Sequence, residues 1–196
     1  MKLFRILPTL LAIALAAGCA GPQTFGGERK RVKDPEQPEW VAKASTADTR
    51  EAKAFVGISN RQAGIPQSRE EAEINAYTTA MNFVGLMVER AIRQVTSQGG
   101  YSTSNRLGAA VVRDAIVSLK GKALLRGEVV EYHTEHWETP QDGDWYETYA
   151  LFLVPREVLQ DAAKEMLNYG KRGRTPEELQ SMERAQEILK DISLAE

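Results

Sequence analysis

The stretch Ser68–Gln98, SREEAEINAYTTAMNFVGLMVERAIRQVTSQ, decides the fold. Ser68 followed by Glu71 has the spacing of a capping box, which predicts that a helix begins at Ser68. Apolar residues then recur every three or four positions in two neighbouring stripes, and the pair Gly99-Gly100 ends the pattern. The first stripe is Ala72, Ala76, Ala80, Phe83, Met87 and Ala91, and the second is Ile74, Tyr77, Met81, Val84, Val88 and Ile92. A helix that is apolar on two sides must be mostly covered, and its alanines allow a sheet to approach closely.

Three stretches predict the sheet that covers this helix. Ala54–Ser59 is a short apolar run with Gly57 inside it, which predicts a strand that another backbone approaches. Residues 124–138 and 145–154 are rich in Val, Tyr, Thr and Trp, and they predict a hairpin with a loop of about six residues at 139–144. The expected fold class is therefore α+β, with a small antiparallel sheet packed against a long Ala-rich helix and further helices at the C-terminus.

Two further helices are expected on either side of the hairpin. The polar residues Ser102–Asn105 provide caps for a helix that runs to Val117, with a strand as the alternative for Ala109–Val112. Pro155 suits the first turn of a helix whose apolar stripe runs from Val158 to Leu167.

The C-terminal residues 170–196 predict a hinge followed by an amphipathic helix. Gly170–Arg174 is a flexible basic segment, and Thr175-Pro176-Glu177-Glu178 supplies an N-cap, a first-turn proline and a capping-box acid. The apolar face that follows consists of Leu179, Met182, Ala185, Leu189 and Ile192. This face must find the domain, a partner or a second copy of the chain.

The N-terminal residues 1–18 predict a secretory signal peptide. Lys2 and Arg5 supply positive charge, and Ile6–Ala17 is an apolar run that would span about 18 Å as a helix. This length falls short of the roughly 30 Å hydrocarbon core that a transmembrane helix must cross.

The only cysteine, Cys19, follows Leu15-Ala16-Ala17-Gly18. This stretch resembles the lipobox of bacterial lipoproteins, which implies lipidation of Cys19 and, with Ala20 next in the chain, location at the outer membrane. An ordinary signal cleaved near Ala16 is the alternative. Two or three acyl chains would anchor the protein firmly, because each buried methylene contributes about 0.8 kcal/mol.

Residues 19–38 contain glycines, prolines and the cluster Arg29-Lys30-Arg31, with no hydrophobic period, so they predict a flexible tether. The basic cluster would either contact anionic headgroups or remain a solvated linker.

Charge and cysteine content exclude several classes of function. The chain has 25 basic and 27 acidic residues, and removal of Lys2 and Arg5 with the signal leaves 23 basic residues and a net charge of −4. A mildly acidic protein is not expected to bind nucleic acid. One cysteine forms neither an internal disulfide nor a cysteine zinc cage.

The two histidines, His133 and His136, are too poorly spaced for a shared metal ion. Residues three apart on a strand point to opposite faces, so cross-strand pairing or exposure is expected instead. Alternating acids on a solvated strand face explain the acidic residues of the hairpin: Glu131, Glu135, Glu138, Asp142 and Asp144. No nucleophile elbow or phosphate loop is present in the sequence, so we expect no enzyme activity, no cofactor and no metal site.

The hairpin aromatics are the candidate ligand or partner surface: Trp137, Trp145, Tyr146 and Tyr149. Such rings are favoured at binding surfaces and as platforms that stack on sugars. They are equally favoured as cross-strand pairs, which is the structural alternative.

The domain expected over residues 39–169 resembles the LPP20 family of bacterial lipoproteins, and the resemblance covers about residues 38–165. The similar stretches are Pro38-Glu39-Trp40, Phe55–Ser59, Ser68–Ala72, Gly127–Val130 continuing to Trp137, and Tyr149–Pro155. The resemblance implies a compact α+β domain in an anchored, non-enzymatic envelope protein that serves structure, assembly or interaction, with envelope proteins or other copies of itself as partners. The alternative function is a periplasmic lipoprotein that binds a glycan or peptidoglycan fragment through the hairpin aromatics.

Overall fold

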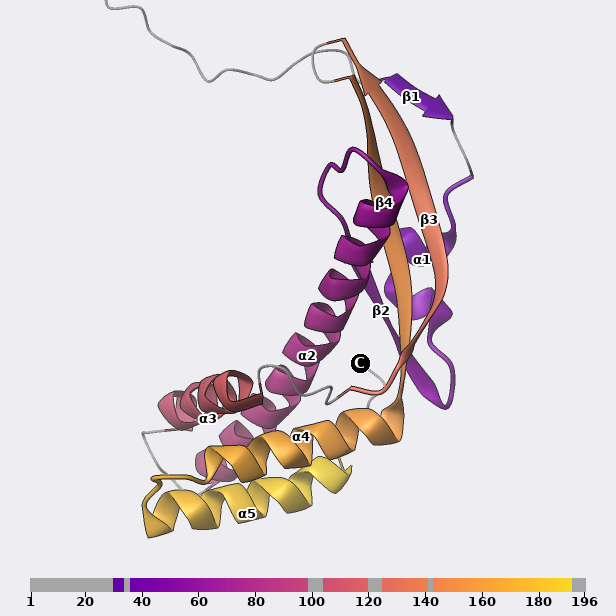
Figure 1. Ribbon diagram of the computed structural model, residues 1–196. Coiled ribbons are helices and arrows are strands. Elements are labelled where there is room, and N and C mark those ends of the chain that lie inside the picture. Colours follow the sequence, from indigo (N-terminus) through magenta and orange to yellow (C-terminus); the bar gives the residue numbers. More distant parts are fainter. Residues whose placement is uncertain (1–29, 34–35, 99–103, 120–124, 141–142, 192–196) are drawn as a thin grey trace, which may run out of the picture.

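The computed structural model describes residues 30–33, 36–98, 104–119, 125–140 and 143–191 (Figure 1). The expected signal peptide, the lipidation site Cys19 and Asp142 lie outside the described residues. Within them, the chain forms an α+β structure in which a curled four-stranded antiparallel sheet packs against one long helix, with further helices at one end of the sheet. The predicted fold class is confirmed.

The sheet is built around a long hairpin of β3 (Glu128–Thr139) and β4 (Gly143–Pro155), with β2 (Ala52–Ile58) beside β4 and β1 (Lys30–Lys33) beside β3. The hairpin was expected to have a loop of about six residues, but strand pairing continues to the pair Thr139 and Gly143. Only three residues separate these two positions in the sequence. Gly143 has a φ of 69°, a conformation that glycine adopts without steric cost.

Helix α2 (Ile65–Gln98) crosses the sheet and approaches it closely at Gly57 of β2. A Cβ atom added at Gly57 would lie 2.7 Å from Cα of Ala76 and would also overlap the backbone at Ala72. The alanine stripe therefore brings helix and strand backbones into contact, as the sequence predicted.

The predicted start of this helix at Ser68 is wrong, because α2 begins at Ile65 with Pro66 in its first turn. The Ser68 hydroxyl donates to the carbonyl oxygen of Ile65 and lies 2.7 Å from the hydroxyl of Thr148 on β4. Glu71 accepts hydrogen bonds from the preceding loop instead, including one from Gln62 Nε2 at 2.6 Å. These hydrogen bonds lower the pKa of the Glu71 carboxyl. The capping-box pair thus ties the helix to the sheet and the loop.

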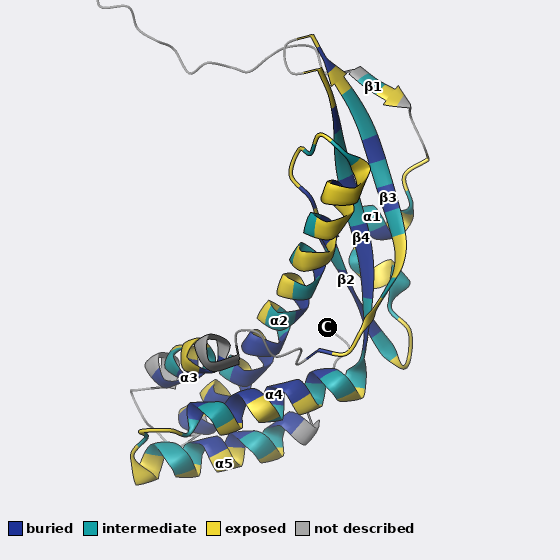
Figure 2. Cartoon of the chain, viewed as in Figure 1, coloured by how far each residue is buried: buried dark blue, intermediate teal, exposed yellow. Residues whose placement is uncertain are grey.

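The second half of α2 packs against three helices: α3 (Ser104–Leu119), α4 (Arg156–Gly170) and α5 (Pro176–Asp191). Figure 2 shows buried positions along α4 and α5, and exposed ones along the outer side of the first half of α2. The helix predicted after Asn105 is confirmed, and its strand alternative is wrong. Pro155 ends β4 and is the N-cap of α4. It was expected in the first turn of this helix and lies one residue before that turn.

The C-terminal helix is part of the core. Met182, Ala185 and Leu189 have no exposed surface and belong to the main apolar cluster. The predicted capping box is confirmed, because the Glu178 amide donates to Thr175 Oγ1 and the Thr175 amide donates to Glu178 Oε2. These three residues of the apolar face of α5 therefore pack within the same domain.

The segment before α5, expected to be a flexible hinge, is a structured turn. Gly170 is buried against Val111, Gly173 has a φ of 72°, and Arg174 Nη2 lies 2.5 Å from Asp114 Oδ2. These contacts attach the turn to α3.

The N-terminal part of the domain covers the sheet face opposite α2. Trp40 of helix α1 (Glu39–Ala42) is buried with Ala54 and Leu151, close to the short 3-10 helix η1 (Ala44–Ala47). Residues 19–38 were expected to form a tether, yet Lys30–Lys33 pairs with β3 as strand β1. Without β1, the outer edge of β3 would expose unpaired backbone N–H and C=O groups, and β1 provides hydrogen-bond partners for part of that edge.

Candidate functional site

The candidate surface lies on the hairpin near the pairing with β1. Trp137 and Trp145 are directly opposed across the strands, with ring centroids 5.5 Å apart and planes inclined by 10°. His133 pairs with Tyr149 at 6.0 Å, and His136 stacks on Tyr146 at 4.7 Å. Cross-strand pairing of both histidines and of all four aromatics, the structural alternative, is therefore what the hairpin forms.

Strand alternation divides the four predicted surface residues between two sheet faces. Trp145 and Tyr149 are an even number of residues apart, and Tyr149 packs with the Trp40 cluster away from α2. Tyr146 is one residue removed from Trp145 and so belongs to the other face, where its backbone also bridges to Gln62. The structure therefore pairs Trp137 with Trp145, places Tyr149 further along the same face beside His133, and puts Tyr146 on the other face.

Two arginines cover the tryptophan pair. The Arg31 guanidinium lies 4.9 Å from the Trp137 ring centroid, and the Arg61 guanidinium lies 4.8 Å from that of Trp145. Cation–π contacts of this kind contribute about 0.5–1 kcal/mol at exposed sites and more where water is excluded. Trp145 is only 6% exposed. The two tryptophan rings thus contact each other and the two arginines, and Trp137 is half-buried.

A buried charge cluster lies beside the tryptophans. The Glu135 side chain is 2% exposed, its Oε1 accepts a hydrogen bond from Arg31 Nη2 at 2.7 Å, and His133 Nε2 lies 3.6 Å away. The expectation that Glu135 belongs to a solvated acidic face is wrong for this residue, because strand alternation places it with His133 and Trp137. Glu131, Glu138 and Asp144 are exposed, as expected.

This environment changes the titration of Tyr149. Burial, followed by the carboxylates of Glu147 and Glu135, raises the pKa of the Tyr149 phenol to about 12. Both causes disfavour the phenolate, because it would carry a negative charge near other negative charges in a poorly solvated place. Tyr149 is therefore neutral at physiological pH and acts here as a packing and hydrogen-bonding group.

Sequence reasoning missed Arg31 as a member of this cluster. It assigned the basic residues to the tether and had no way to match them with a strand that follows more than 100 residues later. The available signal was local: Glu135 lies at strand spacing between His133 and Trp137, so burial of one predicts burial of the other two.

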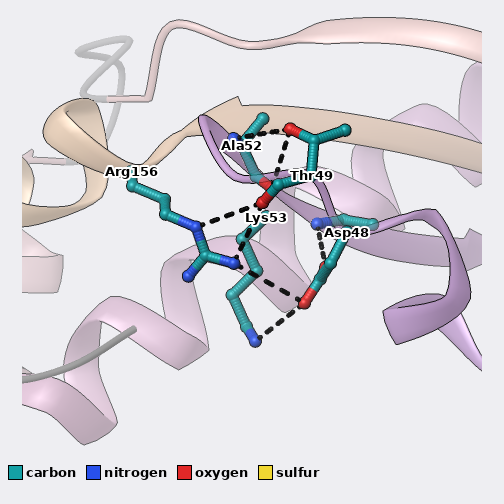
Figure 3. Close-up of polar contacts among 6 residues, drawn as sticks. Asp48, Thr49, Ala52, Lys53 and Arg156 are labelled. Carbon is teal, nitrogen blue, oxygen red and sulfur yellow. Dashed lines mark hydrogen bonds and ion pairs between the residues drawn. The ribbon is translucent and has the colours of Figure 1, made fainter. Parts of the chain in front are cut away.

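A second polar cluster, also missed, joins the turn before β2 to the start of α4 (Figure 3). Asp48 Oδ1 accepts from the Ala54 amide at 2.7 Å, and its Oδ2 lies 3.6 Å from Lys53 Nζ and 4.0 Å from Arg156 Nη2. Arg156 also donates to the Thr49 carbonyl oxygen. An Asp-Thr pair before a strand is a turn signal, and the cluster serves to clamp that turn.

A hollow near this clamp lies at the far end of the sheet from the tryptophans. It has a volume of about 350 Å³ and is lined by Ala52, Arg126, Gly127, Glu128, Val130, Leu153 and Pro155. None of the predicted surface residues lines it.

Within the described ranges, no three His, Cys, Asp or Glu side chains are grouped as ligands for a metal ion. Across the same ranges, none of the helices combines the length and the apolarity needed to cross a bilayer. No family model matches the chain, and no curated protein or solved structure is significantly similar to it.

Proposed function

We propose that this protein is a lipid-anchored lipoprotein of the bacterial cell envelope, held at the outer membrane and facing the periplasm. The observation that carries the proposal is the position of Cys19, directly after an apolar run of signal-peptide length and a series of small residues. The resemblance to the LPP20 family supports the same conclusion.

We further propose that the domain acts by interaction, as a non-enzymatic structural or assembly module. The polar clusters of the described residues are explained by packing: Glu135 by Arg31, and Asp48 by Lys53 and Arg156. The tryptophan pair supports this class over glycan binding, because a sugar-stacking site needs an accessible ring face and here arginines cover both rings.

Self-association through the C-terminal helix is not part of the proposal. Met182, Ala185 and Leu189 have no exposed surface within a single chain, so these three side chains are not available to a second copy. The large apolar side chains that remain exposed on the described part of α2 are Ile65, Ile74 and Leu86, at 39%, 59% and 55%. Contacts with an envelope partner would therefore involve other surfaces than the α5 stripe.

The test is replacement of the single thiol. In cells fed a clickable fatty acid, the native chain should carry the label and fractionate with outer membranes, whereas Cys19→Ser should lose the label and leave the membrane fraction. Ala20→Ser is the matched control, since it changes the neighbouring residue and keeps the thiol. A Cys19→Ser protein that stays in the membrane fraction would contradict the anchor.

The interaction role is tested separately by crosslinking in intact envelopes. The anchored native chain should form a discrete crosslinked species, and the Cys19→Ser protein should form less of it because it is no longer concentrated at the membrane. Uniform, unselective crosslinking of both proteins would argue against an assembly role.

A further inference from the structure

The short strand β1 has a consequence for how the domain sits on a membrane, and this consequence rests on the proposed lipidation of Cys19. Lys30 pairs with Glu138, Arg31 with Trp137 and Lys33 with His136. The chain therefore enters the sheet next to the hairpin tip and runs away from it. Helices α3, α4 and α5 lie at the opposite end of the molecule (Figure 1).

The attachment of β1 is more than a backbone pairing. Arg31 reaches from β1 to the 2% exposed Glu135 with a 2.7 Å hydrogen bond, and its guanidinium also covers the Trp137 ring. Charge-assisted bonds to a buried carboxylate are among the stronger side-chain contacts. Loss of Arg31 would leave Glu135 buried beside His133 without its cation.

The length of chain before β1 limits how far the hairpin tip lies from an anchor. Eleven residue steps separate Cys19 from Lys30 in the sequence, and they span at most about 40 Å when fully extended. Without β1, the first fixed point would be Glu39 of α1, twenty steps from Cys19, with a reach of about 70 Å.

We infer that β1, held by Arg31 on Glu135, is an orienting latch: it keeps the hairpin tip of the lipidated protein near the bilayer and directs α3, α4 and α5 away from it. Strand β3 has twelve residues, which corresponds to a length of about 40 Å. The helical end is thus separated from the anchoring end by the length of the sheet, and it is the part presented to the periplasm.

The test uses the acylated full chain in vesicles of phosphatidylethanolamine and phosphatidylglycerol that contain an energy-transfer acceptor on a headgroup. Acylation consumes the thiol of Cys19, so a reporter cysteine is labelled alone. Glu138→Cys places the donor dye on exposed β3 near the tip, and Arg172→Cys places it in the exposed turn between α4 and α5. Transfer should be several-fold more efficient from position 138 than from position 172.

The latch is tested by adding Arg31→Ala to both reporter proteins. The difference between the two positions should shrink at least two-fold, whereas Arg93→Ala, which removes an equal charge from an exposed position on α2, should leave it unchanged. The comparison of the two reporters in proteins that keep Arg31 tests the orientation even if the Arg31→Ala protein folds poorly.

The outcomes separate the two proposals. Vesicle-bound protein with equal transfer from both reporters, or more from position 172, would overturn the orientation and leave the lipid anchor intact. An unchanged difference in the folded Arg31→Ala protein would overturn the latch. Protein that carries no acyl chain and does not float with the vesicles would overturn the proposed function, and the inference would fall with it.

Discussion

Gly57 of β2 faces Ala76 of α2 so closely that a methyl group on Gly57 would lie 2.7 Å from the Ala76 Cα. Two backbones in contact leave no flexible side chain to move aside, so the contact fixes how α2 crosses the sheet. The small side chains of Ala72 and Ala76 allow this close approach. Larger side chains at these positions would push α2 away from β2.

Gly57→Ala should therefore destabilise the protein by about 3 kcal/mol or more, because overpacking against backbone forces the elements apart. Gly108→Ala is the matched control. Gly108 lies inside α3, where an added Cβ would meet ordinary contacts at 3.5 Å or more, and alanine is favoured over glycine in helices by about 1 kcal/mol. Urea denaturation should show opposite changes in the unfolding free energy, and equal changes would contradict the backbone contact.

Arg31→Met should lower the free energy of unfolding by about 3 kcal/mol, because it leaves the buried Glu135 carboxylate without its cation. Adding Glu135→Leu should recover most of this loss, since an apolar pair replaces the ion pair without leaving a buried charge. Lys164→Met, which breaks an exposed ion pair with Asp161, should change stability by less than about 1 kcal/mol. A double variant no more stable than Arg31→Met would show that Glu135 does not depend on Arg31.

The phenols of Tyr132 and Tyr149 should lose their protons at a higher pH in the folded protein than an ordinary tyrosine does. Burial raises the pKa of each phenol to about 12, assisted by Glu73 at Tyr132 and by Glu147 at Tyr149. Ultraviolet absorbance should show a phenolate step near pH 12 that is lost in the Tyr132→Phe/Tyr149→Phe protein. Both steps appearing at the ordinary tyrosine pKa would contradict the described environments.

The same shifts predict how stability depends on pH. The folded state holds these two protons more tightly than the unfolded state, where a tyrosine has a pKa of about 10. The stability that the folded state gains from holding these protons is fully present below pH 10 and is lost as the pH rises through about 12. Denaturation midpoints should fall less steeply over this range when both tyrosines are phenylalanine.

Met182→Ala should destabilise the protein by about 2–5 kcal/mol, because Met182 is completely buried in the main apolar cluster. Glu183→Ala, at the neighbouring exposed position of α5, should change stability by no more than about 0.5 kcal/mol. Deletion of residues 175–196 should accordingly unfold or aggregate the domain. A truncated chain as stable as the native one would show that α5 is an appended arm.

Elements whose signals are local were predicted well. The alanine stripe of α2, the apolar run of β2, the hairpin and the Thr175 capping box each depend on residues within a few turns or strand positions of one another. The second stripe of α2 was predicted less well, because Ile74 is 59% exposed. Periodicity and caps act at that range, so the α+β class follows from them.

The candidate site was predicted in part. Strand spacing predicted that His133 and His136 point to opposite faces and are either exposed or paired across the strands. It did not predict the burial of Glu135, because the arginine that contacts Glu135 lies 104 residues away on a strand that resembled a linker. The role of Glu71 was also missed, because α2 begins at Ile65 and Ser68 therefore lies inside the helix, where its hydroxyl contacts Thr148 of β4.

By itself, the sequence determined the kinds of elements, their order and the apolar faces that had to be covered, because these properties depend on neighbours along the chain. Only the tertiary structure decided what covers each face: β1 beside β3, Arg31 on Glu135, and α5 within the domain rather than on a second copy. Those contacts join residues far apart in the chain, and their energies depend on burial that exists only once the whole domain has folded.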